Sequence, residues 1–281
     1  MIDSHLHQWQ LARGWHGWNT PELGPLHADA VLADLDDEWA ASGIDAVVLV
    51  QAADVLAETD WLLSIAREDR RVAGVVGYLP LSDPGQLRDL LIAYADTALV
   101  GVRQLWHDHP RPDALADPDV LTALRLLAEA GLAVDVPDAF PRLWPALTTA
   151  VRGAPQTTFV LDHCGKPPFG DRRAWTGWEA DFARLVRNPN VVVKLSGLFG
   201  GSGSTSPATD AELDRVVDLA LDLAGPRRTM IGSDWPMTRG TLGYAATIRR
   251  LTALLSRLTR DELAAVTAGT ARAVYGLDAA G

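Results

Sequence analysis

Eight short apolar runs alternate with longer amphipathic stretches along this chain of 281 residues. The runs are rich in Val, Ile and Leu and nearly continuous in apolar character, as parallel strands buried on both faces are. They cover residues 1–6, 44–51, 72–79, 98–105, 131–136, 157–163, 190–196 and 229–234. Eight strand–helix units in a chain of this length are typical of a closed (β/α)₈ barrel. We therefore predict an α/β fold consisting of one (β/α)₈ TIM-barrel domain over residues 1–281.

The stretches between these runs have helical periodicity and recognisable ends. Gly43 can take the left-handed conformation that ends a helix, Asp54 is a candidate N-cap, and Thr259 to Glu262 have capping-box spacing. The glycine-serine stretch 200–206 directly follows a strand, so we predict a loop there and not a domain boundary. Helices are predicted over residues 29–42, 55–70, 84–94, 118–130, 141–152, 175–187, 208–224 and 244–258, with a last one from residue 259.

The charge and the cysteine count exclude several classes of partner. Lys and Arg number 25 against 36 Asp and Glu, a net charge of −11. An acidic chain without a basic cluster repels phosphate backbones and anionic lipid, so we expect neither nucleic acid nor membrane as a partner. The N-terminus lacks a signal-peptide pattern, and the single cysteine, Cys164, excludes an internal disulfide. We predict a cytoplasmic protein and leave homo-oligomerisation open.

Polar and ionisable side chains gather where the apolar runs stop. The carboxyl ends of barrel strands form the floor of the active site in enzymes of this fold. A barrel selected for stability alone would more often end its strands in Gly, Asn, Ser or Thr. The strand ends carry, in chain order, His5, His7, Gln51, Tyr78, Arg103, Asp135, His163, Lys194, Ser196 and Asp234.

His5 and His7 stand two residues apart at the end of a predicted strand, so both imidazoles project from the same face. Two such imidazoles can bind a divalent metal or donate together to a substrate carbonyl. Asp234 ends the last strand, and a carboxylate beside histidines can accept a proton from water as a general base. The structural alternative for Asp234 is a cap or Asx-turn to the following loop.

The other strand ends have structural alternatives as well. His163 can be a packed histidine that is hydrogen-bonded to backbone, and Arg103 can pair with Asp135 or Glu58. Lys194 is one of only two lysines and lies within an apolar strand, where a structural role is less expected. Cys164 is predicted to be a small buried neighbour of His163 and not a nucleophile.

Tryptophans fall just beyond several strand ends, and their faces can stack on sugar rings. Packing between loops is the alternative, and for each tryptophan taken separately it is the favoured one. The predicted substrate-binding residues are Arg103, Lys194, Trp9, Trp106, Trp235, Gln51 and Asp135.

Five ordered motifs resemble the lactonase branch of the amidohydrolase superfamily. They are DSHLHQW, VGVRQLW, FVLDHCGKPP, NVVVKLSGL and MIGSDWPM, and the terminal TAGTARAVYGL is similar to the closing helix of that family. The resemblance covers essentially the whole chain and implies an amidohydrolase-like barrel that hydrolyses a cyclic ester. It also implies that His5, His7 and His163 face the substrate carbonyl, that Asp234 deprotonates the attacking water, and that Arg103 holds the substrate.

Two departures from that pattern bear on metal use. Gln104 stands where relatives often carry a histidine, which puts that contact in doubt. Binuclear members of the superfamily carry a carboxylated lysine on the fourth strand and a histidine on the fifth, where this chain has Arg103 and Asp135. We therefore expect no two-metal site. We predict either no obligatory cofactor or one divalent ion, zinc or manganese, held by His5, His7 and Asp234.

An uncharged, hydroxyl-rich lactone suits Trp9, Trp15 and Trp18 at the rim. A dianionic pyrone would need several cations, and beyond Arg103 and Lys194 few can be placed at the mouth, with Arg13 as a candidate. The predicted partner is thus a small-molecule lactone substrate. One alternative is a metal-dependent decarboxylase of the same superfamily, although the fifth strand, GLAVDVPDAF, lacks the histidine that it would want. The other is a non-catalytic sugar-binding barrel, which explains the tryptophans but not the histidines.

Overall fold

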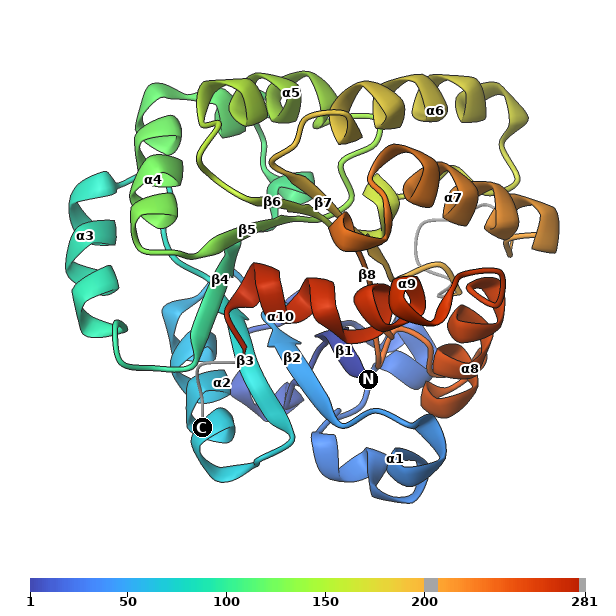
Figure 1. Cartoon of the computed structure of the whole chain (residues 1–281). Coiled ribbons are helices and arrows are strands. Elements are labelled where there is room, and N and C mark those ends of the chain that lie inside the picture. Colours follow the sequence, from blue (N-terminus) through green and yellow to red (C-terminus); the bar gives the residue numbers. More distant parts are fainter. Residues whose placement is uncertain (200–206, 278–281) are drawn as a thin grey trace.

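The computed structural model describes residues 1–199 and 207–277, and the strands in these ranges form one eight-stranded parallel sheet in sequence order. Each predicted apolar run contains one of these strands, which confirms the α/β barrel (Figure 1). The strands are β1 (Ile2–Leu6), β2 (Ala46–Val50), β3 (Val72–Gly77), β4 (Leu99–Arg103), β5 (Ala133–Val136), β6 (Phe159–Leu161), β7 (Val191–Leu195) and β8 (Thr229–Ile231).

The barrel closes where the end of β8 returns to the end of β1. The backbone N–H of Asp234 donates to the carbonyl of His5 at 2.8 Å, and the N–H of His7 donates to the carbonyl of Trp235 at 2.8 Å. These two bonds also place Asp234 beside the two histidines. Closure of the barrel therefore brings together residues that are more than 220 positions apart in the sequence.

Six strands end one to three residues earlier than predicted, and β6 and β8 stop before a residue of the candidate site. His163 and Asp234 were expected as the last residues of strands, but β6 stops at Leu161 and β8 at Ile231. His163 has φ 54° and Asp234 has φ 57°, a left-handed backbone that cannot continue a strand. The chain thus turns sharply at both residues as it leaves the barrel.

The helices follow the predicted alternation, with shifted ends. They are α1 (Asp36–Ser42), α2 (Leu56–Glu68), α3 (Pro84–Ala93), α4 (Pro118–Glu129), α5 (Trp144–Gly153), α6 (Arg172–Val186), α7 (Asp210–Leu223), α8 (Tyr244–Leu254), α9 (Arg260–Ala264) and α10 (Thr270–Tyr275), with a π-helical turn Ala265–Gly269 between the last two. The loop predicted over residues 200–206 lies outside the described residues.

Local signals at the helix ends are confirmed in two cases and wrong in two. Gly43 ends α1 with φ 68°, and Thr259 forms a capping box with Glu262. Asp54 does not cap α2, because its carboxylate instead accepts the backbone N–H of Leu105 at 3.0 Å. Residues 29–31 are not helical, because Ala30 pairs with Trp9 in an isolated antiparallel bridge.

Two apolar clusters stabilise the barrel. The larger cluster lies between the strands and the helices that surround them. The smaller one fills the inside of the barrel, where Val48, Val76 and Val160 pack against Ala271 and Tyr275 of α10. Figure 1 shows α10 lying across the strands. This helix covers one end of the barrel, so we expect a ligand site at the opposite end, where the strands have their carboxyl ends.

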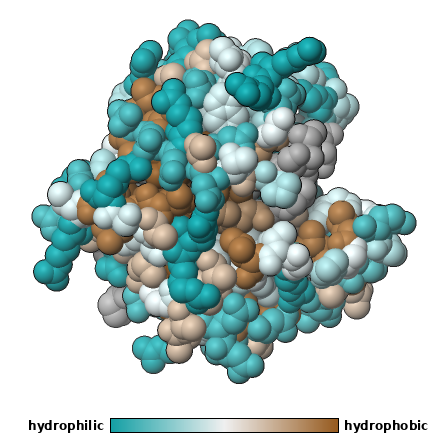
Figure 2. Space-filling view, turned by 90° about the vertical axis from the view of Figure 1, so that its right-hand side faces the viewer, coloured by the Kyte–Doolittle hydropathy of each residue, from teal (hydrophilic) through white to brown (hydrophobic). Residues whose placement is uncertain are grey.

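None of the described helices is long and apolar enough to cross a membrane. The face turned toward the viewer in Figure 2 mixes hydrophilic side chains with apolar ones that lie between them.

Candidate active site

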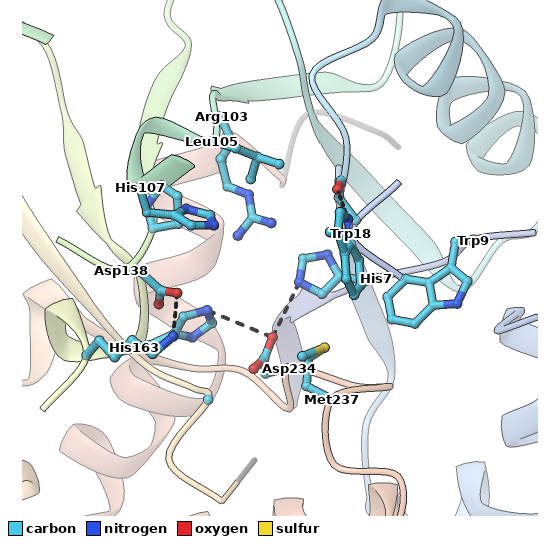
Figure 3. A pocket seen from close by; sticks show the side chains of 14 residues that line it. His7, Trp9, Trp18, Arg103, Leu105, His107, Asp138, His163, Asp234 and Met237 are labelled. Atoms are coloured by element: carbon cyan, nitrogen blue, oxygen red, sulfur yellow. Dashed lines mark hydrogen bonds and ion pairs between the residues drawn. The ribbon is translucent and has the colours of Figure 1, made fainter. Parts of the chain in front are cut away.

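A pocket of about 280 Å³ opens at the carboxyl ends of the strands, beside the closure of β1 and β8. Its volume is near the lower end of the range of small-molecule sites, roughly 300–1,000 Å³, so it suits a small ligand. Figure 3 shows Asp234 and His7 at its base, with Asp138 and His107 on one side and Trp18 on the other. The wall is formed by His7, Trp9, Trp18, Ala52, Arg103, Leu105, His107, Pro137, Asp138, His163, Lys166, Gly197, Asp234 and Met237.

Three imidazoles surround one carboxylate at the base of this pocket. Oδ1 of Asp234 lies 3.3 Å from Nε2 of His7, 3.7 Å from Nε2 of His5 and 3.9 Å from Nε2 of His163. This oxygen is buried and has no hydrogen-bond partner within the described ranges. Burial opposes ionisation of Asp234, but the three imidazoles outweigh it and hold the pKa of Asp234 well below its usual range. The carboxylate is therefore ionised at pH 7.

The histidines are held in place by hydrogen bonds on their other nitrogens. Nδ1 of His7 donates to the carbonyl of Val50 at 2.8 Å, so its Nε2 is free of hydrogen. Nδ1 of His163 lies 2.9 Å from Oγ of Ser196. Burial lowers the pKa of His7, and it holds the pKa of His5 well below its usual value. Both rings are thus neutral at pH 7, the form that binds metals.

The spacing of these atoms fits a single divalent ion. Nε2 of His5 and Nε2 of His7 are 3.2 Å apart. In a tetrahedral zinc site with bonds of 2.0–2.1 Å, ligand atoms lie about 3.3 Å from one another. The unpartnered Oδ1 of Asp234 completes a set of three donors of this size, within one group of residues that can hold a metal. His5, His7 and Asp234 therefore fit the ion.

Beneath this constellation, a fully buried network of charges fills the barrel. Nζ of Lys194 lies 2.5 Å from Asp135, 3.3 Å from Asp162 and 3.2 Å from Nδ1 of His5. Tyr275 of α10 donates to Asp135 at 2.9 Å. Burial raises the pKa of Asp135 to about 6, whereas Lys194 and His5 overcome burial and hold the pKa of Asp162 well below its usual range. The network supports His5 from behind.

Arg103 connects this network to the pocket. Its Nη1 lies 3.2 Å from Asp162 and 3.4 Å from Nε2 of His5, and its Nη2 donates to the carbonyl of Gln51 at 2.8 Å. The predicted structural partners, Asp135 and Glu58, are therefore wrong, because Asp135 pairs with Lys194 and Glu58 with His16. Nε of Arg103 is buried and has no hydrogen-bond partner in the described part of the chain.

Two glycines allow the close packing of these side chains. A Cβ on Gly197, which has φ 61°, would stand 2.6 Å from Nδ1 of His163 and 3.0 Å from Oδ2 of Asp234. A Cβ on Gly232 would stand 2.6 Å from the Cβ of His5. Any larger residue at either position would displace a histidine of the site.

The predicted site residues divide into two groups. His7, His163, Asp234, Arg103 and Trp9 line the pocket, and His5 lies directly behind His7 and Asp234. Five of the predicted substrate contacts do not reach the pocket wall, because their side chains are buried in the barrel or under loops; they are Gln51, Asp135, Lys194, Trp106 and Trp235.

Four residues of the site and its support were missed as functional candidates. Asp162 directly precedes His163 in the sequence, and Asp138 follows β5 within the same VDVPDAF segment. His107 lines the pocket. It stands three residues after Gln104, and Gln104 is the position at which members of the resembled branch often carry a histidine. Lys166 is the other of the two lysines of the chain and was assigned no role. A search of the residues that follow each strand, and not only of its last residue, would have found them.

Cys164 is fully buried, and its thiol donates to the carbonyl of Lys194 at 3.5 Å. Burial raises the pKa of this thiol far above its usual value. We expect the folded protein to react with a disulfide reagent such as dithiobis(nitrobenzoate) much more slowly than the same protein in guanidinium chloride, because the thiolate is the reactive form. Equal rates in the two states would show that Cys164 is accessible and reactive.

A family model described as Amidohydrolase matches residues 2–277 of the chain. The chain belongs to this family. An L-fucono-1,5-lactonase of Burkholderia multivorans is 32% identical to this amidohydrolase over 98% of the present chain and 96% of the relative. A crystal structure of a B. multivorans amidohydrolase with bound HEPES has a TM-score of 0.89 at 30% identity, and one with bound zinc has 0.88 at 29%; each covers 98% of both chains.

Proposed function

We propose that this amidohydrolase hydrolyses an uncharged sugar-acid lactone of the L-fucono-1,5-lactone type. The observation that supports it most is the ionised carboxylate of Asp234, whose Oδ1 lies within 3.9 Å of three imidazoles in a pocket that Arg103 also lines. The names of two relatives that are 32% identical over 85% and 98% of the chain support the same class of substrate.

In the proposed reaction, Asp234 accepts a proton from water while the water oxygen bonds to the lactone carbonyl carbon. A carboxylate with so low a pKa is always deprotonated but is a weak base, so the carbonyl must be polarised at the same time. Arg103 and the imidazoles of His7 and His163 line the pocket that Asp234 also lines, and His5 lies behind His7 and Asp234. Arg103 and His163 donate N–H groups to the oxyanion as it forms, while His5 and His7 lie against Asp234 and support that carboxylate. The ring C–O bond then breaks, and the proton on Asp234 returns to the leaving alkoxide.

His5, His7 and Asp234 would hold one zinc or manganese ion. When bound, the ion would polarise the carbonyl as a Lewis acid. The chain also offers a complete arrangement of its own, since Lys194 can donate to Nδ1 of His5, and Nε2 of His5 can in turn donate to Nε2 of His7. We therefore propose that a metal binds but is not obligatory.

A lactone panel tests the function. The protein is assayed by proton release as isolated, after chelation and after reloading with zinc, together with metal analysis. We expect hydrolysis of neutral 1,5-lactones such as L-fucono-1,5-lactone, at most one ion per chain, and retention of most activity after chelation. Loss of activity on chelation that zinc restores would instead make the ion part of the chemistry.

The same samples distinguish the two alternatives drawn from the sequence. Release of carbon dioxide from an aromatic carboxylate would indicate the decarboxylase. Tight binding of a sugar without turnover of any lactone would indicate the binding protein.

A further inference from the structure

An ion pair in the pocket wall is not used by the proposed reaction. Nζ of Lys166 lies 2.6 Å from Oδ2 of Asp138, and the two side chains are 32% and 21% exposed. Asp138 lies in the loop after β5, and Lys166 in the loop after β6, so the pair joins two loops at the pocket mouth. The ammonium group has three N–H donors and the carboxylate has about four acceptor sites. The pair therefore keeps hydrogen-bonding capacity for a ligand.

Backbone strain marks both residues. In the described part of the chain, the non-glycine residues with positive φ are Asp138, His163, Cys164, Lys166 and Asp234, with φ between 42° and 65°. All of them except Cys164 line the pocket. A left-handed backbone costs energy in a residue with a Cβ, and it persists mainly where a site requires it. Asp138 and Lys166 thus have the same strained backbone conformation as His163 and Asp234, two of the proposed catalytic residues.

The charges of the wall favour a neutral ligand. Apart from histidines, the wall carries two cations, Arg103 and Lys166, and two carboxylates, Asp138 and Asp234. Burial opposes ionisation of Asp138, but His163 and Lys166 outweigh it and lower its pKa, so this carboxylate is charged at pH 7. It would repel an anionic substituent on a substrate. A ring hydroxyl, by contrast, can donate to Asp138 and accept from Lys166 at once.

The opposite wall suits the same kind of ligand. Trp18 stands across the pocket from Asp138 (Figure 3), and its Nε1 is held by the carbonyl of Ala52 at 2.8 Å. An indole fixed in this way offers its apolar face to a flat ring whose polar edge points to the ion pair.

We propose that Asp138 and Lys166 form the subsite that recognises ring hydroxyls and restricts this enzyme to neutral, polyhydroxylated lactones. The proposal rests on the proposed function, because it assumes that a lactone ring occupies this pocket. The competing interpretation is an ion pair that only ties the two loops together. A structural pair would affect stability and all substrates alike, whereas a hydroxyl subsite distinguishes substrates that differ only in hydroxyl groups.

The test compares L-fucono-1,5-lactone with δ-valerolactone, which has the same six-membered lactone ring but lacks the hydroxyl groups and the methyl group. In Asp138→Asn and Lys166→Met, we expect kcat/KM for the hydroxylated lactone to fall by about 10- to 150-fold, as for the loss of a hydrogen bond to a charged group. The value for δ-valerolactone should change little. Asp181→Asn is the matched control, because it removes one charge of an ion pair with Arg184 on α6, far from the pocket wall. It should leave both values unchanged.

Binding of L-fucose, which carries ring hydroxyls but no ester, separates this proposal from the proposed function. Titration followed by tryptophan fluorescence should show binding to the wild type and weaker binding to both variants, even if no lactone is hydrolysed. Equal losses for both lactones, or unchanged selectivity together with unchanged sugar binding, would overturn the subsite.

Discussion

Asp234→Asn is expected to lower kcat for lactone hydrolysis by about 10²- to 10⁴-fold, the usual contribution of a general base. The amide has the same shape as the carboxylate but cannot take a proton from water. The change would be measured by steady-state proton release on the best lactone of the panel. KM should change less than kcat, because the substrate contacts of Arg103 remain.

The control for this substitution is a second Asp→Asn change outside the pocket. Asp83 caps α3 by accepting the N–H groups of Gly85 and Gln86, so Asp83→Asn should leave kcat unaltered. Circular dichroism and thermal unfolding must show that the Asp234→Asn protein is folded. Near-normal turnover in a folded Asp234→Asn protein would remove Asp234 from the role of base.

Lys194→Met is expected to lower the free energy of unfolding by about 3–5 kcal/mol, the usual cost of breaking a buried ion pair by removing one partner. The ammonium group is fully buried between Asp135 and Asp162, at 2.5 and 3.3 Å. Without the ammonium group, both carboxylates stay buried and lose the cation that pairs with them. Urea unfolding followed by fluorescence measures the loss.

The loss should depend on pH in a defined direction. The pKa of Asp135 is already raised to about 6 by burial, and removal of Lys194 would raise it further. A group whose pKa is raised in the folded state contributes stability at low pH and loses it as the pH rises through the folded value. Relative to the wild type, the Lys194→Met protein should therefore lose the least unfolding free energy near pH 5 and the most above pH 7.

The double variant Lys194→Met/Asp135→Asn is the matched control. It removes the carboxylate nearest to Lys194 together with the ammonium group, so it should recover part of the lost stability. A single variant as stable as the wild type at pH 8 would show that the buried pair contributes no net stability, and a double variant no better than the single one would assign the loss to Asp162.

Much of the fold was predictable because it depends on local patterns. Alternating apolar runs and amphipathic stretches indicated every strand of the barrel, and Gly43 and Thr259 marked helix ends through their own backbone and side-chain chemistry. The exceptions had non-local causes. Asp54 was expected to cap its own helix, but its carboxylate bonds the backbone of Leu105, in a loop about fifty residues away.

Lys194 shows why the site was only partly predictable. Its position within a buried strand was correctly recognised as unusual, but the sequence could not tell how deep in the barrel its side chain ends. The structure places it below the pocket, against Asp135 and Asp162. How deep a side chain lies in the barrel depends on the register between neighbouring strands, which the sequence of one strand does not determine.

The sequence by itself determined the barrel, the order of its strands and the chemical character of their ends, because hydrophobic periodicity and strand–helix alternation are local properties. It also singled out His5, His7, His163 and Asp234. Only the tertiary structure decided which polar groups meet. The closure of β8 on β1 sets Asp234 beside the histidines, and left-handed turns after β5 and β6 bring Asp138 and Lys166 together. Such contacts depend on strand register and loop dihedral angles across the whole barrel, which local patterns do not specify.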